Sequence, residues 1–143
     1  MEYLWIIFAL LSALTASLVA IFGKIGLQGI DTNTATAIRA IIMALFLIGL
    51  IVIQGKLTEI NSIFANSKAL FYIILSGIVG ALSWLFYFIA LKSAKVSQVV
   101  PIDRLSIVFA LIFALLFLGE TISLKAGIGA ALVVAGGILI ALG

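Results

Sequence analysis

The sequence predicts an all-α integral membrane protein, a bundle of five transmembrane helices that takes up nearly the whole chain. Hydrophobic residues make up 66% of the 143 residues and charged residues 9%, and the mean hydropathy is +1.46. The apolar residues fall into five runs, each close to the roughly 20 residues that a helix needs to cross the hydrocarbon core. Lipid offers the backbone no hydrogen bonds, so each run should be helical. The expected spans are Tyr3–Phe22, Thr34–Ile53, Ala69–Leu91, Val96–Leu118 and Ile122–Leu142.

Almost nothing remains for an aqueous domain, so residues 1–143 are expected to form a single transmembrane domain whose function lies among the spans. The chain has no cysteine and no histidine, which removes disulfides, thiol redox chemistry, thiolate zinc sites, haem ligation and imidazole acid–base pairs. No nucleophile, base and orienting residue form a set, so an enzyme is not expected. No cofactor is expected. The net charge of +3 is spread over the loops, which favours contact with anionic lipid headgroups and not with nucleic acid.

The first two spans carry few polar side chains. In the first, Ser12, Thr15 and Ser17 either line a cavity or bond to the preceding helical turn. In the second, Arg39 lies about a turn and a half inside the span. An ionisable residue at such a depth is costly and is therefore a candidate for substrate binding. The alternative is that Arg39 extends to the membrane surface.

The third span contains a strip of small and polar residues. Ser83 and Tyr87 are four residues apart, and Ser76 and Gly80 share a face with Ser83. Trp84 lies deep in the span, where anchoring at the membrane surface explains it poorly. A polar strip beside an aromatic wall suits a pocket for an organic or amphipathic solute, so Ser83, Trp84 and Tyr87 are candidate binding residues.

Pro101 lies in the first turns of the fourth span, just before Asp103 and Arg104. Proline removes one helical hydrogen bond, and a weakened helix beside polar residues is a common way for transporters to expose backbone groups to a substrate. Proline in the first turns of a helix is also an ordinary start signal. Asp103 is a candidate partner for Arg39 or Lys24, which would leave one cation for an anionic substrate group.

The fifth span has small residues in place of polar ones. Gly127, Ala131 and Ala135 recur on one face and Gly129, Gly136 and Gly143 on the next. Small residues allow close approach of helix backbones. This span is therefore expected to pack against other helices, with a dimer seam as one possibility.

Charge in the loops gives little preference for one orientation. Threading five spans places three lysines near each side of the membrane: Lys56, Lys68 and Lys125 on one, Lys24, Lys92 and Lys95 on the other. Basic loops normally stay in the cytoplasm and set the orientation. A balance this even favours insertion in both orientations; the alternative is one orientation set by Arg39 and Arg104 or by a partner.

The stretch VPIDRLSIVFALIFALLFLGETISLKAGIGAALVVAGGILIAL resembles the second half of an EamA domain of the drug/metabolite transporter superfamily. The resemblance rests on Leu118, Gly119 and Glu120 in a tight turn and on a following helix with Gly129 and the pair Gly136 and Gly137. Most members of that family have two such domains in inverted orientation, so this chain resembles the half-size type. The resemblance implies transport of small metabolites or drugs, often export. Gly119 is expected to end its helix in a left-handed conformation, and Glu120 to lie near the start of the next helix.

The favoured function is a secondary transporter in the cell membrane that works as an antiparallel homodimer or as a heterodimer with a paralogous half. Two oppositely oriented copies would restore the inverted symmetry that alternating access commonly uses. Two alternatives remain: a flippase subunit for a lipid-linked headgroup, and a membrane assembly subunit that transports nothing.

Overall fold

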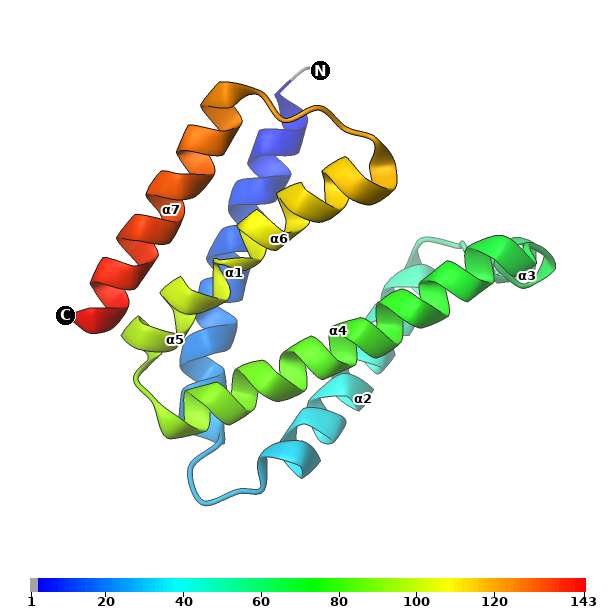
Figure 1. The fold of residues 1–143 in the computed structure, drawn as a ribbon. Coiled ribbons are helices and arrows are strands. Elements are labelled where there is room, and N and C mark those ends of the chain that lie inside the picture. The colour runs from blue at the N-terminus through cyan, green and yellow to red at the C-terminus, as the bar shows by residue number, and fades with distance from the viewer. Residues whose placement is uncertain (1–2) are drawn as a thin grey trace. The chain divides into compact units, whose positions relative to one another are not determined.

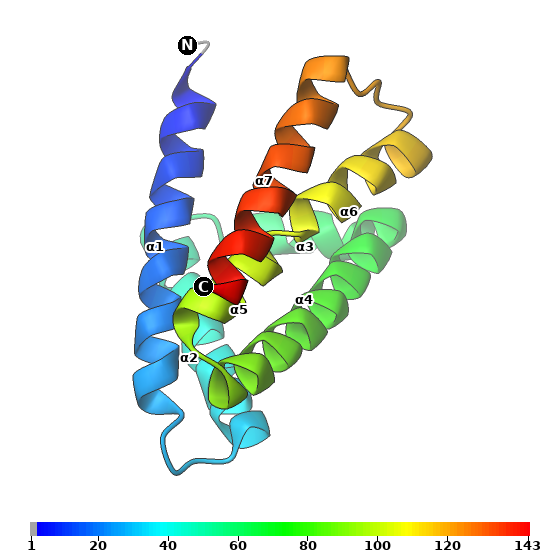
Figure 2. The same ribbon diagram turned by 60° about the vertical axis from the view of Figure 1, so that its left-hand side comes forward.

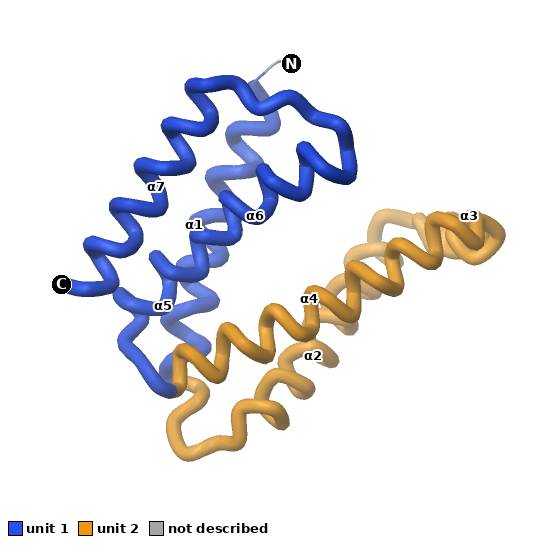
Figure 3. The backbone as a smooth tube through the Cα atoms, in the orientation of Figure 1, with its two compact units in different colours: residues 1–25, 93–143 blue, residues 26–92 orange. Residues whose placement is uncertain are grey.

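The computed structural model describes residues 3–143, and it is helical wherever the chain is regular. Within that range, five helical segments are long and apolar enough to cross a membrane, which confirms the predicted fold class. The chain divides into two compact units, residues 1–25 with 93–143 and residues 26–92 (Figure 3). The helices are α1 (Leu4–Gly26), α2 (Thr32–Ile53), α3 (Glu59–Ala65), α4 (Ser67–Ser93), α5 (Val96–Asp103), α6 (Ser106–Phe113) and α7 (Leu124–Leu142).

Helices α1, α2 and α4 are longer than the apolar runs that predicted them. α2 begins at Thr32, two residues before the expected start, because the Asp31 carboxylate accepts hydrogen bonds from the backbone N–H and the hydroxyl of Thr34. These bonds satisfy a donor that a helix start leaves without a partner, and they lower the pKa of the Asp31 carboxyl. α4 extends to Ser93, so polar residues join both of its ends.

The loop between α2 and α4 contains a short helix that was not predicted. α3 has seven residues and lies between Gly55, which has a positive φ of 67°, and Asn66. The side-chain oxygen of Asn66 accepts a hydrogen bond from the N–H of Ala69 and so caps the start of α4. All residues of α3 are exposed. α3 is too short and too polar to cross the membrane. It was missed because the helices were predicted from long apolar runs, and α3 has none.

The fourth span is interrupted shortly after Pro101, the residue that indicated either a weakened helix or an ordinary helix start. Pro101 has no N–H to donate, and α5 ends two residues later at Asp103. Through the break, the N–H of Leu105 bonds to Ile102 and that of Ile107 bonds to Arg104, each three residues back. α6 then runs into a π-helical turn, Ala114–Leu118, which Gly119 ends at φ 66° and ψ 21°. The predicted left-handed Gly119 is confirmed.

α7 begins at Leu124, two residues later than predicted. The N–H of Glu120 bonds to the carbonyl of Ala114, behind it in the chain. Ser123 is the residue that caps α7, accepting from the N–H of Ala126 at 3.2 Å. The first turn of α7 contains no acidic residue, and Glu120 lies three residues before the Ser123 cap, so its interaction with that helix start stays a prediction.

Within the first unit, α7 lies along α5 and α6 runs away from it toward the turn at Gly119 (Figures 1 and 2). Gly137 is buried, and a Cβ placed on it would lie 3.0 Å from the carbonyl oxygen of Pro101. The side-chain amide of Gln98 also donates to the carbonyl of Ala141, at 3.5 Å. The small residues of α7 thus pack against the proline turn of the same chain.

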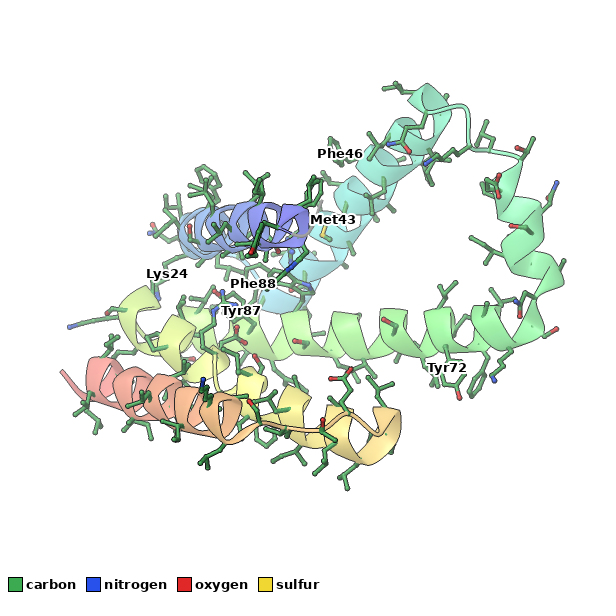
Figure 4. The ribbon with its side chains drawn as sticks, turned by 90° about the horizontal axis from the view of Figure 1, so that it is seen from above. Lys24, Met43, Phe46, Tyr72, Tyr87 and Phe88 are labelled. Carbon is green, nitrogen blue, oxygen red and sulfur yellow. The ribbon has the colours of Figure 1, made fainter. Side chains whose placement is uncertain are left out.

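Within the second unit, α2 and α4 converge near Phe88 and diverge toward α3 (Figure 4). Burial follows the same gradient. Thr32, Thr36, Phe88 and Leu91 are buried, whereas every residue of α2 from Ala40 to Leu50 is exposed. The converging end therefore holds the packed side chains of this unit.

We predict that Gly137→Ala destabilises the protein. The added methyl group would press on the Pro101 carbonyl, and overpacking of this kind costs about 1–3 kcal/mol. Gly136→Ala is the matched control, since no atom lies within 4 Å of its Cβ position. Thermal unfolding in detergent, followed by circular dichroism, should give a lower midpoint for Gly137→Ala alone. Equal midpoints for the two variants would contradict the close contact of α5 and α7.

Candidate functional site

Arg39 lies against aromatic rings of α4. It is the eighth residue of α2 and lies on the same side of the helix as the buried Thr32 and Thr36. Its Cζ atom is 3.6 Å from the centroid of the Trp84 ring and 4.9 Å from that of Phe88. A guanidinium at such distances is attracted to the ring faces by about 0.5–2 kcal/mol.

Three aromatic side chains form one cluster beneath Arg39. The ring centroids of Trp84 and Phe88 are 5.6 Å apart, and Tyr87 meets Trp84 edge to face at 5.7 Å and Phe88 at 5.8 Å. Pairs of this geometry stabilise by about 0.5–1.5 kcal/mol beyond the area that they bury. We call Arg39, Trp84, Tyr87 and Phe88 the Arg39 cluster.

The cluster lies on the face of α4 that is packed. Gly80, Trp84, Phe88 and Leu91 follow one another at spacings of four, four and three residues, which places them on one side of a helix. Phe88 is 3% exposed and Leu91 is fully covered, and Phe88 points toward α2 in Figure 4. Sequence reasoning found Trp84 and Tyr87 and missed Phe88, although its position four residues after Trp84 was a usable signal.

Two further charged residues lie near this end of the second unit. The ammonium of Lys92 donates a hydrogen bond of 2.9 Å to the carbonyl of Ile30, which ties the end of α4 to the loop before α2. Asp31, the residue after Ile30, accepts a hydrogen bond from the backbone N–H of Thr34. Within the second unit, residues 26–92, no carboxylate lies within salt-bridge distance of Arg39.

The charged residues predicted in the fourth span belong to the first unit. Asp103 ends α5, Arg104 follows in the break, and both are exposed. In the described chain Asp103 does not pair with Lys24, whose ammonium donates to the carbonyl of Ala94 at 2.8 Å. The pairing of Asp103 with Arg39 stays a prediction. Pro101 contacts Gly137 through its carbonyl.

The hydroxyl candidates divide into two kinds. Thr15 bonds to the carbonyls of Leu11 and Ser12 in its own helix, at 2.9 and 3.0 Å, which is the alternative that requires no cavity. Ser17 does the same with Leu14. Ser12 and Ser83 are exposed. Ser83 precedes Trp84, so of the hydroxyl candidates it is the one next to the Arg39 cluster in the chain.

Comparison with known proteins gives the family. Residues 3–142 match the model of the EamA-like transporter family. The chain belongs to the EamA-like transporter family. An uncharacterized transporter of a Sinorhizobium species is 37% identical over 141 residues, which cover 99% of each chain. An uncharacterized protein of Methanocaldococcus jannaschii is 33% identical over 82 residues, 57% of this chain and 60% of that one. No solved structure matches at a significant level.

As an EamA-like protein, the chain is a membrane-embedded small-molecule transporter. The Arg39 cluster gives it a fixed cation on an aromatic wall, a combination able to orient an anionic group and to cover an apolar body. Over residues 3–143, no three His, Cys, Asp or Glu side chains gather to form a metal site.

We predict that Phe88→Ala destabilises the protein by more than about 1 kcal/mol, because it removes two ring pairs and one of the rings near Arg39. Phe86→Ala is the control: it lies two residues earlier on the same helix and is 65% exposed. The thermal midpoints of both variants in one detergent give the comparison. A larger effect of Phe86→Ala would show that α4 packs on the opposite face.

Proposed function

We propose that this EamA-like chain is a secondary transporter that exports small organic molecules across the cell membrane and works as a dimer by alternating access. Family membership supports the transport of a small molecule. The Sinorhizobium relative, which is named a transporter, matches over 99% of both chains and so has the same half-size length. A half-size chain suits assembly from two copies, since transporters of this kind commonly alternate between two related halves.

The observation that supports a dimer is how few residues of each span are buried. In each of the five candidate spans, 6% of the residues in the most apolar stretch are buried. A transporter must enclose a path that substrate follows and lipid does not enter. Helices exposed to this extent provide few enclosed surfaces, whereas a second copy supplies a second set of helices.

α7 offers a surface for that second copy. Its Gly129, Gly136 and Gly137 are at least partly covered, and Gly137 packs on α5. The other series of small residues, Gly127, Ala131 and Ala135, stays exposed. Small residues four apart allow close helix contact in lipid, so we place the dimer seam on this second series.

We predict that the chain inserts in both orientations. The chain lacks cysteine, so Ser62→Cys and Gly143→Cys each create a single reporter. Both residues are exposed, and five spans place them on opposite sides of the membrane. A membrane-impermeant thiol reagent applied to intact cells should label each variant in about half of the molecules, because loop charge selects no orientation. Full labelling of one variant and none of the other would contradict the antiparallel homodimer and direct the search to an oppositely oriented partner.

The transport proposal itself is tested by ligand protection followed by flux. The purified protein is heated with a panel of water-soluble metabolites and, separately, with lipid phosphates. Protection by water-soluble compounds, and their movement into liposomes that contain the protein, is the expected result. Protection by lipid phosphates alone would favour a flippase, and the absence of any flux would contradict a transporter.

A further inference from the structure

The contact between Arg39 and Trp84 leaves the hydrogen-bonding edge of the guanidinium unused. A Cζ atom 3.6 Å from a ring centroid is at stacking distance, at which the flat side of the guanidinium meets the ring. The five N–H donors of an arginine lie in its plane, around the edge. The rings therefore hold the charge without accepting its hydrogen bonds.

No residue of the second unit accepts these hydrogen bonds either. Within residues 26–92, Arg39 has its ring contacts and no hydrogen bond or ion pair. The same residues contain no buried side-chain nitrogen or oxygen that lacks a partner. The nitrogens of Arg39 are thus not enclosed by their own unit, and another molecule can supply the acceptor.

The depth of Arg39 argues against simple extension to the membrane surface. Arg39 is seven residues after Thr32, about 10 Å along the helix, and Trp84 is nine residues before Ser93, about 13 Å from that end of α4. Stacking holds the guanidinium at the level of Trp84. A free cation at such a depth is costly in lipid, and a ring contact offsets only part of that cost.

The charges around the cluster favour an anion as the missing partner. Lys92 adds a second cation at the same end of the second unit. Asp31, the acidic residue there, is held by the backbone and the hydroxyl of Thr34. A positive excess at one end of a helix pair attracts anions, and a guanidinium edge binds a carboxylate or phosphate through two parallel hydrogen bonds.

Extending the transport function proposed above, we propose that the Arg39 cluster is a binding site for organic anions. The carboxylate or phosphate of the ligand bonds to the edge of Arg39, and its apolar body lies against the half-buried rings of Trp84 and Tyr87. A water-soluble metabolite and an anionic lipid headgroup both have this chemistry. A cationic analogue of the same shape brings no acceptor to the Arg39 edge, and a neutral amide brings one uncharged carbonyl oxygen in place of the two charged oxygens, so the site discriminates against both.

The test uses Trp84 as its own reporter. The chain has two tryptophans, so Trp5→Phe leaves Trp84 as the single one. Full-length protein in nanodiscs of zwitterionic lipid is titrated with 3-phenylpropionate, 3-phenylpropanamide and 3-phenylpropylammonium, which differ in charge at one end. We expect a saturable change in Trp84 fluorescence with the anion, at an affinity at least about tenfold above that for the other two, as loss of a charged hydrogen bond implies.

Variants of Arg39 complete the test. Arg39→Gln should remove the preference for the anion, and Arg39→Lys should keep the charge but weaken binding because it loses the two-pronged edge. Lys68→Gln, which removes an exposed cation at the opposite end of α4, should bind as the parent does. Equal affinities for the three compounds, no saturable response to the anion, or an unchanged preference in Arg39→Gln would each overturn the proposal.

A second arm identifies the source of the anion. Nanodiscs that contain phosphatidylglycerol are compared with zwitterionic ones in the absence of 3-phenylpropionate. An Arg39-dependent change in Trp84 fluorescence would support the site with a lipid headgroup as its ligand, and no change would support a soluble anion when 3-phenylpropionate binds. These measurements need no transport. A protein that binds anions without flux contradicts the transporter alone, and one that carries only cations or neutral solutes contradicts the anion site alone.

Discussion

The absence of hydrogen-bonding water in the hydrocarbon core is the constraint on which the rest of this structure depends. It makes the chain helical through its apolar runs, and it makes each helix end and each interruption a place where a carbonyl needs a donor. Long polar side chains supply some of these donors. Lys24 donates to Ala94, Lys92 to Ile30 and Gln98 to Ala141. The break after Pro101 is bridged by bonds between residues three apart. The loops at Ile30 and Ala94 and the end of α7 at Ala141 are each tied in this way to another part of their unit.

The same constraint explains which parts of the fold could be predicted. The five spans followed from run length, because lipid leaves no alternative to a helix. Helix ends and short helices were harder to predict. α2 begins early because of the Asp31 cap, and α3 has no apolar run to indicate it. The break in the fourth span could be predicted only in part. Pro101 indicated a weakened helix, but no pattern in the sequence marks Ser106 as the residue at which the helix resumes.

The candidate site shows a similar division. A charge inside a span identified Arg39, and depth identified Trp84. Their contact at 3.6 Å depends on how α2 and α4 are rotated about their axes and how they are aligned. Neither quantity can be read from one helix, which is why Phe88 was missed as a member of the cluster. The sequence identified the side chains, and the packing of α2 against α4 brought them into contact.

The hydrogen bonds of Lys24 and Lys92 affect how orientation can evolve. Loop lysines are the signals that the insertion machinery reads, yet these two also supply the donors for the carbonyls of Ala94 and Ile30. Moving either charge to another loop would leave one of those carbonyls without its donor. Lys56 and Lys68 make no side-chain hydrogen bond within residues 3–143. Those two lysines can therefore be gained or lost, with their effect on orientation, at little structural cost.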